Sequence, residues 1–300
     1  MKEKRLKGTN IRFTAGDRAF YALIDVFLVL VLVIVFIPMW STITLSLRPN
    51  TFIGSNLEGM FLAPWKWSTA AYRALLGNRG FLNAFLNSGK IFVFGVATAL
   101  FLTIPLAYVL SVRTLPGRKP LTIIVLIPYL FNVGLIPTYL VVTRLGLNNH
   151  LAAVFLPGAI GTYNCLIMRG FFEGIPDELK ESARIDGAAE WYVLLRIILP
   201  LSKPIIMTIG LYYGVSFWND FFNAMLYISN NALQPLPILL RNILMATGMN
   251  EFVEVSAFGQ APIQAIKAAS VFMAAIPMVA AYPFIQKYFT KGTLLGSVKG

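Results

Sequence analysis

Residues 181–200 read ESARIDGAAEWYVLLRIILP and form the longest polar segment between two strongly apolar runs in the second half of the chain. The segment carries five charged side chains, in a 300-residue protein that is 57% apolar and 13% charged. A soluble domain averages about 45–50% apolar and about 25% charged residues, so lipid must be the solvent for part of this chain. This polar segment must therefore leave the membrane between the two apolar runs that flank it, and this requirement constrains the fold.

Six apolar runs are each long enough to cross about 30 Å of hydrocarbon as a helix. They cover roughly residues 19–40, 91–112, 121–142, 151–172, 205–228 and 265–288. The first run exceeds the apolar core of a cleaved signal peptide, about 7–15 residues, so we expect it to be retained. Prolines inside several runs favour a bundle with a path through it over simple anchors. The sequence predicts an all-α, polytopic membrane protein with six transmembrane helices in a domain spanning residues 19–288.

The distribution of the basic residues indicates which side of the membrane each loop and terminus faces. Seventeen of the 25 Lys and Arg residues lie in residues 1–18, 113–120, 169–203 and 287–300, which fall on one side of a six-span membrane protein. Cytoplasmic loops carry an excess of Lys and Arg. We therefore expect the basic N-terminus (1–18), residues 174–203 and the C-terminal tail (289–300) to be cytoplasmic. Topology also explains the formal net charge of +12 better than binding to nucleic acid does.

Residues 174–203, here named the 174–203 segment, have the pattern of a helix–turn–helix. Pro176 suits the first position of a helix, and the acidic residues that follow it complement the helix dipole. The pair Asp186-Gly187 breaks this helix. A second helix is expected from about Ala188 to Ile198, with Trp191, Leu194, Leu195 and Ile198 on one face.

Two interpretations of this segment are open. An amphipathic interfacial loop would be rich in Lys and Arg, whereas the charges here nearly balance. Small residues at 182, 183 and 187–189 allow close backbone approach, and charge pairs fix register across an interface. The pattern favours docking into a groove of another protein.

The same segment resembles the EAA loop of ABC importer permeases. The resemblance rests on Glu181-Ser182-Ala183, on Gly187 and on the run from Ile197 to Pro200, with Ser182 as the one departure from that pattern. The stretch from Arg184 to Ala188 resembles the carbohydrate-uptake branch, and residues 286–300 resemble the ending of its MalG-like permeases. The resemblance implies that the segment forms coupling helices in a cleft of a separate ATPase. The docking residues would be Glu181, Ser182, Ala183, Arg184, Asp186 and Gly187.

The resemblance also implies partners and a location. It implies a second homologous permease subunit, two ATPase subunits that bind ATP and Mg²⁺, and an extracytoplasmic solute-binding protein. The location would be the cytoplasmic (inner) membrane of a bacterium, with both termini cytoplasmic. In MalG-like permeases the tail reaches the ATPase dimer, so Val298, Lys299 and Gly300 are expected there.

Motifs for catalysis are missing from the sequence. Around Gly89-Lys90 a phosphate-binding loop would need Gly at position 84 and Ser or Thr at position 91, where Ala84 and Ile91 stand. One cysteine, Cys165, and one histidine, His150, disfavour a metal site or a catalytic triad. We expect a non-catalytic chain with no cofactor of its own, driven by a partner ATPase.

Polar residues within the apolar runs are candidates for a sugar path, because burying them in lipid is costly. Trp218, Asn219 and Asp220 combine an aromatic face for a sugar ring with groups for its hydroxyls. Tyr163 and Asn164 form a second pair. The alternative for Asn164, Asn219 and Asp220 is a structural role, as helix caps or cross-links between helices.

Charge at the outer side suggests a substrate class. The outer loops and helix ends hold eight basic residues against Glu58, Glu251 and Glu254, and such an excess focuses anions. This favours an anionic, uronate or alginate-like oligosaccharide. The alternatives are contact with an acidic binding protein or with lipid phosphates. A different function, ion-coupled secondary transport, would need acidic residues at the bilayer midplane, for which only Asp25 and Asp220 are available.

Overall fold

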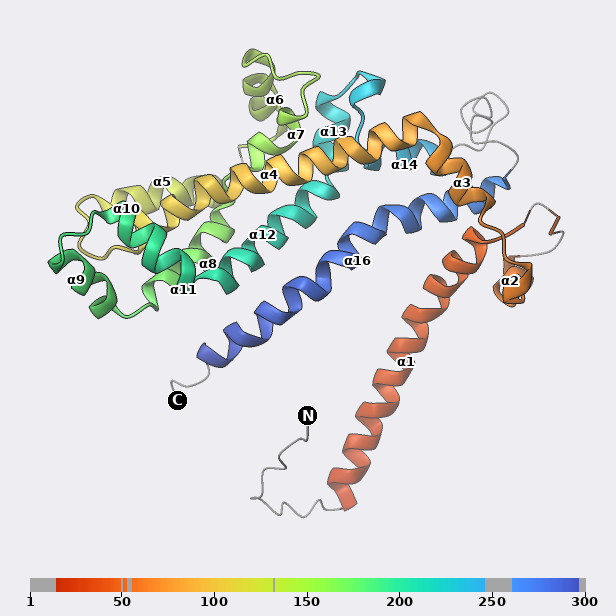
Figure 1. Ribbon diagram of the computed structural model, residues 1–300, viewed down its shortest axis with the longest axis horizontal. Helices are drawn as coiled ribbons and strands as arrows, with labels where there is room; N and C mark the ends of the chain where they lie inside the picture. The colour runs from red at the N-terminus through yellow and green to blue at the C-terminus, as the bar shows by residue number, and fades with distance from the viewer. Residues whose placement is uncertain (1–14, 50, 53–55, 132, 246–260, 297–300) are drawn as a thin grey trace.

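The computed structural model describes residues 15–49, 51–52, 56–131, 133–245 and 261–296, and within these ranges the chain is helical and contains no strand. Figure 1 shows long helices fanning from one end of the molecule. This end, named the far end, holds α3 (Ala70–Gly77) and α14 (Leu236–Met245). The opposite loop end holds α9 (Asp177–Ile185), α10 (Glu190–Tyr192) and α11 (Leu199–Leu201). The expectations for Glu251, Glu254 and residues 298–300 lie outside the described residues.

The central helix is α4 (Arg79–Ser111), which runs from the far end to the loop end and packs against α8 (Thr162–Glu173) and α12 (Lys203–Trp218). Glycines permit the close approach of α4 and α12. A Cβ on Gly214 would lie 2.5 Å from the Phe92 ring, and one on Gly95 would lie 2.7 Å from the Phe217 ring. The apolar core continues along these helices to the loop end, where Leu110 and Ile198 are buried.

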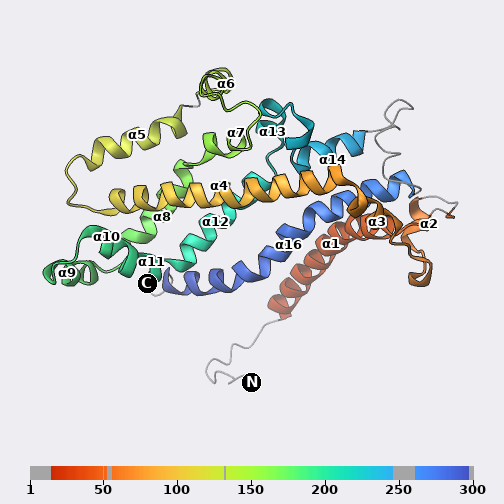
Figure 2. The same cartoon turned by 45° about the horizontal axis from the view of Figure 1, so that its top comes forward.

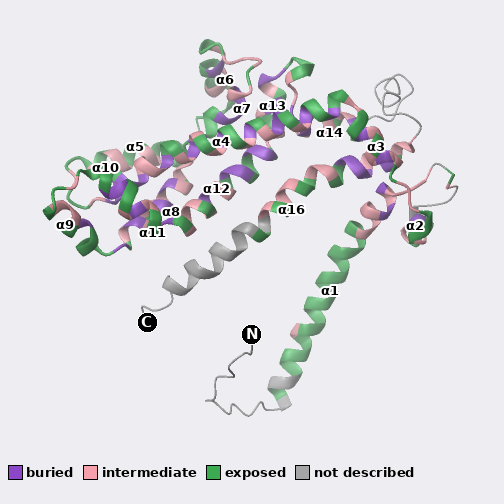
Figure 3. Ribbon diagram, in the orientation of Figure 1, coloured by how far each residue is buried: buried purple, intermediate pink, exposed green. Residues whose placement is uncertain are grey.

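The first helix, α1 (Ala15–Ser46), leans away from this bundle (Figure 1). It packs against α16 (Ile263–Gly296), yet the most apolar window of α1 is 0% buried. Only its far end is covered, where Thr44 and Ser46 are buried and Trp40 donates a hydrogen bond from Nε1 to the Met60 carbonyl at 3.1 Å. Figure 3 shows most of the remaining described length of α1 as exposed.

Among the described residues, three helices are long and apolar enough to cross a membrane, or up to five spans if each of two bent helix pairs counts as one. The three helices overlap the first, second and sixth predicted runs. The structure breaks the other three runs. Residues 121–142 divide into α5 (Arg118–Leu130) and α6 (Leu135–Arg144), bent by 112°, with Gly134 at a φ of +81° just before α6. Residues 151–172 divide into α7 (Ala152–Phe155), a 3₁₀ turn (Leu156–Gly158) and α8. In the fifth run α12 ends at Trp218 and α13 (Phe221–Tyr227) follows.

Polar side chains fasten the far end. On α4, Asn87 donates from Nδ2 to the carbonyls of Ala232 and Gln234, and the Ser88 hydroxyl accepts from the Leu236 amide at 2.8 Å. Both side chains are buried. The 3₁₀ turn Asn231–Leu233 and the start of α14 are therefore held directly against α4.

Candidate functional site

The 174–203 segment folds into helices joined by a glycine turn. Asp177 and Glu178 lie in the first turn of α9, where they complement the positive end of the dipole, and Pro176 precedes that turn as the N-cap. The helix ends at Ile185, with Asp186 as its C-cap, and Gly187 follows with a φ of +83° that suits glycine. The Gly187 amide donates to the Arg184 carbonyl, and the Ala188 amide donates to the Ala183 carbonyl at 2.9 Å. These two bonds form a Schellman motif, so the predicted break at residues 186–187 is confirmed.

The second helical stretch differs from its predicted face. After α10, residues Val193–Ile198 form a π-helical turn, and α11 follows. Pro200 has no N–H to donate to the carbonyl four residues earlier, which favours such a widened turn. Leu194 and Ile198 are buried together with Val193, whereas Trp191 is 65% exposed and Leu195 is 55% exposed. Of the four residues predicted to share one face, only Leu194 and Ile198 are thus buried within the chain, and the π-helical turn departs from the 3.6 residues per turn that the prediction assumed.

Lys180 anchors α9 to the membrane-spanning part of the chain. It is the one buried charged residue in the described ranges, at 6% exposure. Its Nζ donates to the Phe172 carbonyl at the end of α8 (3.3 Å) and to Asp177 Oδ1 (2.9 Å). The hydrogen bond from Lys180 holds the pKa of the Asp177 carboxyl below its usual range.

Arg184 and Glu190 join the two helices of the segment across the glycine turn. Arg184 donates from Nε to Glu190 Oε1 at 2.7 Å and from Nη2 to Oε2 at 3.3 Å. The Tyr108 hydroxyl, in the last turn of α4, donates to Glu190 Oε2 at 2.6 Å. These bonds, with Arg184 contributing most, lower the pKa of Glu190. The Arg184 guanidinium is thus bound to Glu190 of the same chain rather than extended toward solvent.

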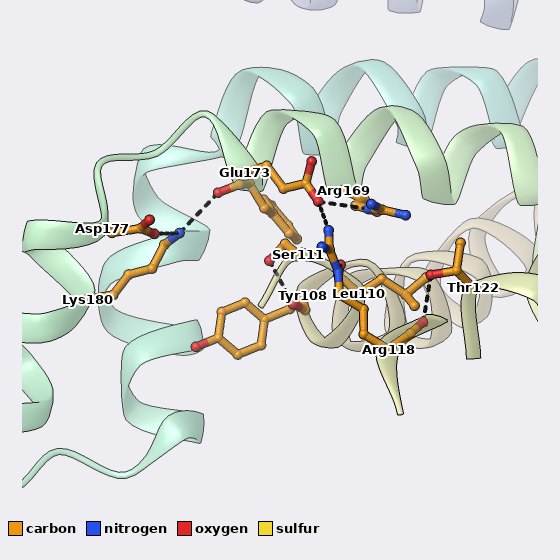
Figure 4. A network of polar contacts seen from close by, with 10 residues as sticks. Tyr108, Leu110, Ser111, Arg118, Thr122, Arg169, Glu173, Asp177 and Lys180 are labelled. Atoms are coloured by element: carbon orange, nitrogen blue, oxygen red, sulfur yellow. Dashed lines mark hydrogen bonds and ion pairs between the residues drawn. The ribbon is translucent and has the colours of Figure 1, made fainter. Parts of the chain in front are cut away.

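A second charged cluster ties the ends of α4, α5 and α8 together, and Figure 4 shows it beside Lys180. Glu173 forms ion pairs with Arg118 and with Arg169, the latter at 2.9 Å. Arg118 also donates from Nε to the Leu110 carbonyl of α4 at 2.8 Å. No local sequence pattern marks Tyr108, Arg118 or Glu173 as functional. The available signal was that charged groups are rare and that these lie where helices end.

The remaining predicted docking residues face outward. Glu181, Ser182, Asp186 and Gly187 are exposed, and Ala183 is half-buried against the core. An apolar side chain accompanies them, since Ile185 is 86% exposed. The segment therefore offers a small, mixed polar and apolar surface at the loop end, bound from behind through Lys180 and Arg184.

The predicted sugar-path residues lie in two places. Tyr163 and Asn164 lie at the start of α8, whereas Trp218, Asn219 and Asp220 lie at the junction of α12 and α13. Tyr163 and Asn219 are exposed.

Three of these residues have structural partners, and Asn219 donates from Nδ2 to the Val215 carbonyl at 2.9 Å. Trp218 is buried with its ring edge-on to Phe85 and Phe92, and its Nε1 donates to the Ala274 carbonyl at 3.1 Å. Asp220 caps α13 by accepting from the Asn223 amide. Their role in a sugar path stays a prediction. In the part of the chain that the structure describes, no three His, Cys, Asp or Glu side chains gather to hold a metal ion.

Known proteins resemble this chain over almost its whole length. No family model matches it. It is 40% identical over 286 residues to the polygalacturonan/rhamnogalacturonan transport system permease protein YtcP of Bacillus subtilis, covering 95% of this chain and 99% of that protein. It is 43% identical over 244 residues to protein LplC of the same organism, covering 81% of this chain and 83% of LplC.

A solved structure agrees with these sequence relatives. A bacterial ABC transporter involved in the import of the acidic polysaccharide alginate matches with a TM-score of 0.83 and 29% identity, covering 92% of this chain and 99% of the matched chain. The chain belongs to the family of permease subunits of carbohydrate ABC transport systems.

Proposed function

We propose that this chain forms half of the membrane path of an ATP-driven importer for uronate-containing oligosaccharides, and that its 174–203 segment docks into a partner ATPase. Closure of the ATPase pair would move the segment and switch the permease between inward- and outward-facing states. The observation that carries this proposal is the surface at Glu181–Gly187, because five of its seven residues are exposed in the described part of the chain while Lys180 and Glu190 bind the segment from behind.

Family membership makes the chain a multi-pass protein of the inner membrane and a subunit of a sugar-import system. Permease subunits of this kind are generally non-catalytic and work with a partner permease, an ATPase and a binding protein. ABC membership displaces the alternative of an ion-coupled secondary transporter.

We further propose the finer arrangement. Two ATPase subunits, which carry ATP and Mg²⁺, serve one second permease and this one. The chain crosses the membrane six times, with the three broken runs each counted as one span. Both termini and the 174–203 segment are cytoplasmic. The positive-inside bias supports this orientation, and so does the location of α9–α11 at the end of the molecule opposite α14.

Anionic oligosaccharides are the proposed substrate class. On α3, α4 and α6, Arg73, Arg79 and Arg144 are exposed and form no ion pair with any residue the structure describes. Basic groups at an entrance raise the local concentration of anions. YtcP is a polygalacturonan/rhamnogalacturonan transport system permease, and the similar solved structure is that of a transporter involved in the import of the acidic polysaccharide alginate; both support the same class.

Release of the ATPase tests the docking surface. With the complex expressed in full, Glu181→Lys should reduce the ATPase that co-purifies with the permease several-fold, because it reverses a charge on the docking surface. Glu181→Gln, which keeps the size, should reduce it less. Glu58→Lys makes the same charge change at the far end and serves as the control. Full retention of the ATPase by Glu181→Lys would defeat the docking assignment.

Competition between sugars tests the substrate class. Membrane vesicles containing the complete transporter and its binding protein should take up a uronate oligosaccharide faster than a neutral one of equal length. This preference should shrink as salt rises, because salt screens the basic entrance. Equal uptake of both sugars with no salt dependence would overturn the anionic assignment. In that case the basic groups would instead contact an acidic binding protein or lipid phosphates.

A further inference from the structure

Glu190 is the point at which three helices meet at the loop end. It accepts from Arg184 of α9 and from Tyr108 of α4, and it is itself the first residue of α10. We propose that Tyr108 is a positioning residue for transport: its hydroxyl attaches the 174–203 segment to α4 and passes movement of that segment into the membrane helices. This inference rests on the proposed docking of the segment on an ATPase.

The bond is suited to carry movement. Tyr108 is 5% exposed, so its ring, which projects from the last turn of α4, is buried in the core. Its hydroxyl lies 2.6 Å from Glu190 Oε2, and Glu190 is ionised and paired with Arg184. Hydrogen bonds to an ionised group are shorter and about twice as strong as neutral ones. The two helices of the segment and α4 therefore share one carboxylate.

A second attachment makes the loop end move as a unit. Lys180 links α9 to the last turn of α8 through the Phe172 carbonyl. The neighbouring Glu173 forms an ion pair with Arg118 of α5, and Arg118 donates a hydrogen bond to the Leu110 carbonyl of α4 (Figure 4). Because α4, α5 and α8 are joined to one another, a displacement of the segment reaches all three together.

The path from Tyr108 continues along α4 to the far end. This helix has 33 residues, about 50 Å at 1.5 Å per residue. At its other end Asn87 and Ser88 bind the backbone around the start of α14. A shift of the loop end of α4 is thus transmitted to the far end through a continuous helix with polar attachments at both ends.

The Tyr108→Phe variant tests this role, because it removes one oxygen and keeps the ring in its packing site. In proteoliposomes holding the complete transporter, with its ATPase and binding protein, we expect assembly to be unchanged. Sugar uptake per ATP hydrolysed should fall about tenfold, as expected for the loss of a hydrogen bond to a charged group. Tyr129→Phe is the matched control, since Tyr129 is exposed on α5, and it should leave this ratio unchanged.

Variants of Glu190 separate the bond from general damage. Glu190→Gln retains a carbonyl oxygen that can accept from Tyr108, so it should keep most of the uptake per ATP. Glu190→Ala removes the Tyr108 bond and both Arg184 bonds, so it should lower uptake per ATP at least as far as Tyr108→Phe. Combining Glu190→Ala with Tyr108→Phe should add little, because both remove the same bond.

The outcomes distinguish this inference from the docking proposal. If ATPase co-purifies with Tyr108→Phe and uptake per ATP stays normal, the positioning role is overturned while docking stands. If Tyr108→Phe loses its ATPase or fails to assemble, the bond maintains the fold rather than transmitting movement, and the inference is again overturned. Failure of Glu181→Lys to release the ATPase would instead remove the docking proposal.

Discussion

At the scale of single residues, Glu190 gives the loop end a defined pH dependence. Hydrogen bonds from Arg184, first, and from Tyr108 lower its pKa in the folded chain. A group with a lowered folded-state pKa stabilises the fold above its unfolded pKa, about 4.3 for Glu. That contribution is lost as the pH falls through the lower folded value. The link between α9, α10 and α4 should therefore be intact at pH 7 and down to about 4.3.

Hydrogen exchange of peptides covering residues 184–192, corrected for intrinsic rates, measures this link. Protection should stay constant from pH 7 to about 4.5 and fall only below that range. In Glu190→Gln, which has no carboxyl to titrate, the fall should disappear. A loss of protection near pH 6 in the unmodified chain would contradict the assigned pairing.

Local residue patterns predict the turn of this site but not its long-range bonds, because those bonds join residues far apart in the sequence. The turn at Gly187 could be predicted, because a helix break depends on residues next to one another. The bond between Tyr108 and Glu190 joins positions 82 residues apart, and no local pattern encodes it. Likewise, Trp218 looked available for a sugar, but its burial depends on α4 and α16.

At the scale of elements, the packing of α4 on α12 depends on glycine. A Cβ on Gly214 would lie 2.5 Å from the Phe92 ring, so Gly214→Ala should separate the helices and destabilise the chain by about 1–3 kcal/mol. Gly210, one turn earlier, would meet Leu100 at an ordinary 3.4 Å, and Gly210→Ala should be tolerated. Thermal unfolding of the purified complex measures both. Equal midpoints for the two variants would show that this contact does not limit stability.

Element boundaries were predictable only in part. Hydropathy located the first, second and sixth runs, because a long uninterrupted helix is what an apolar run of that length dictates. Hydropathy also presented residues 121–142 and 205–228 as continuous. Backbone features break them: a positive φ at Gly134 and the capping of α13 by Asp220. Such features change the path of the chain without changing its apolar character.

At the scale of the whole molecule, α1 is the element that the isolated chain leaves uncovered. Its apolar side chains are exposed from Phe20 to Met39, and only its far end is packed. Lipid can cover such a helix on every side. A second permease would cover one face of it, and the α1 helix leaning away from its own bundle (Figure 1) is placed to reach a neighbouring subunit.

Cross-linking distinguishes lipid from a partner as the cover of α1. Single cysteines are introduced in turn from Val26 to Phe36, while the native Cys165 is buried and so contributes little background. If the second permease covers α1, cross-links to it should recur about every 3.6 residues and mark one face of the helix. The same variants expressed without the second permease provide the control. Absence of cross-links at every position would mean that α1 contacts only lipid, and the partner permease would then have to bind the surface of α4, α12 and α16 instead.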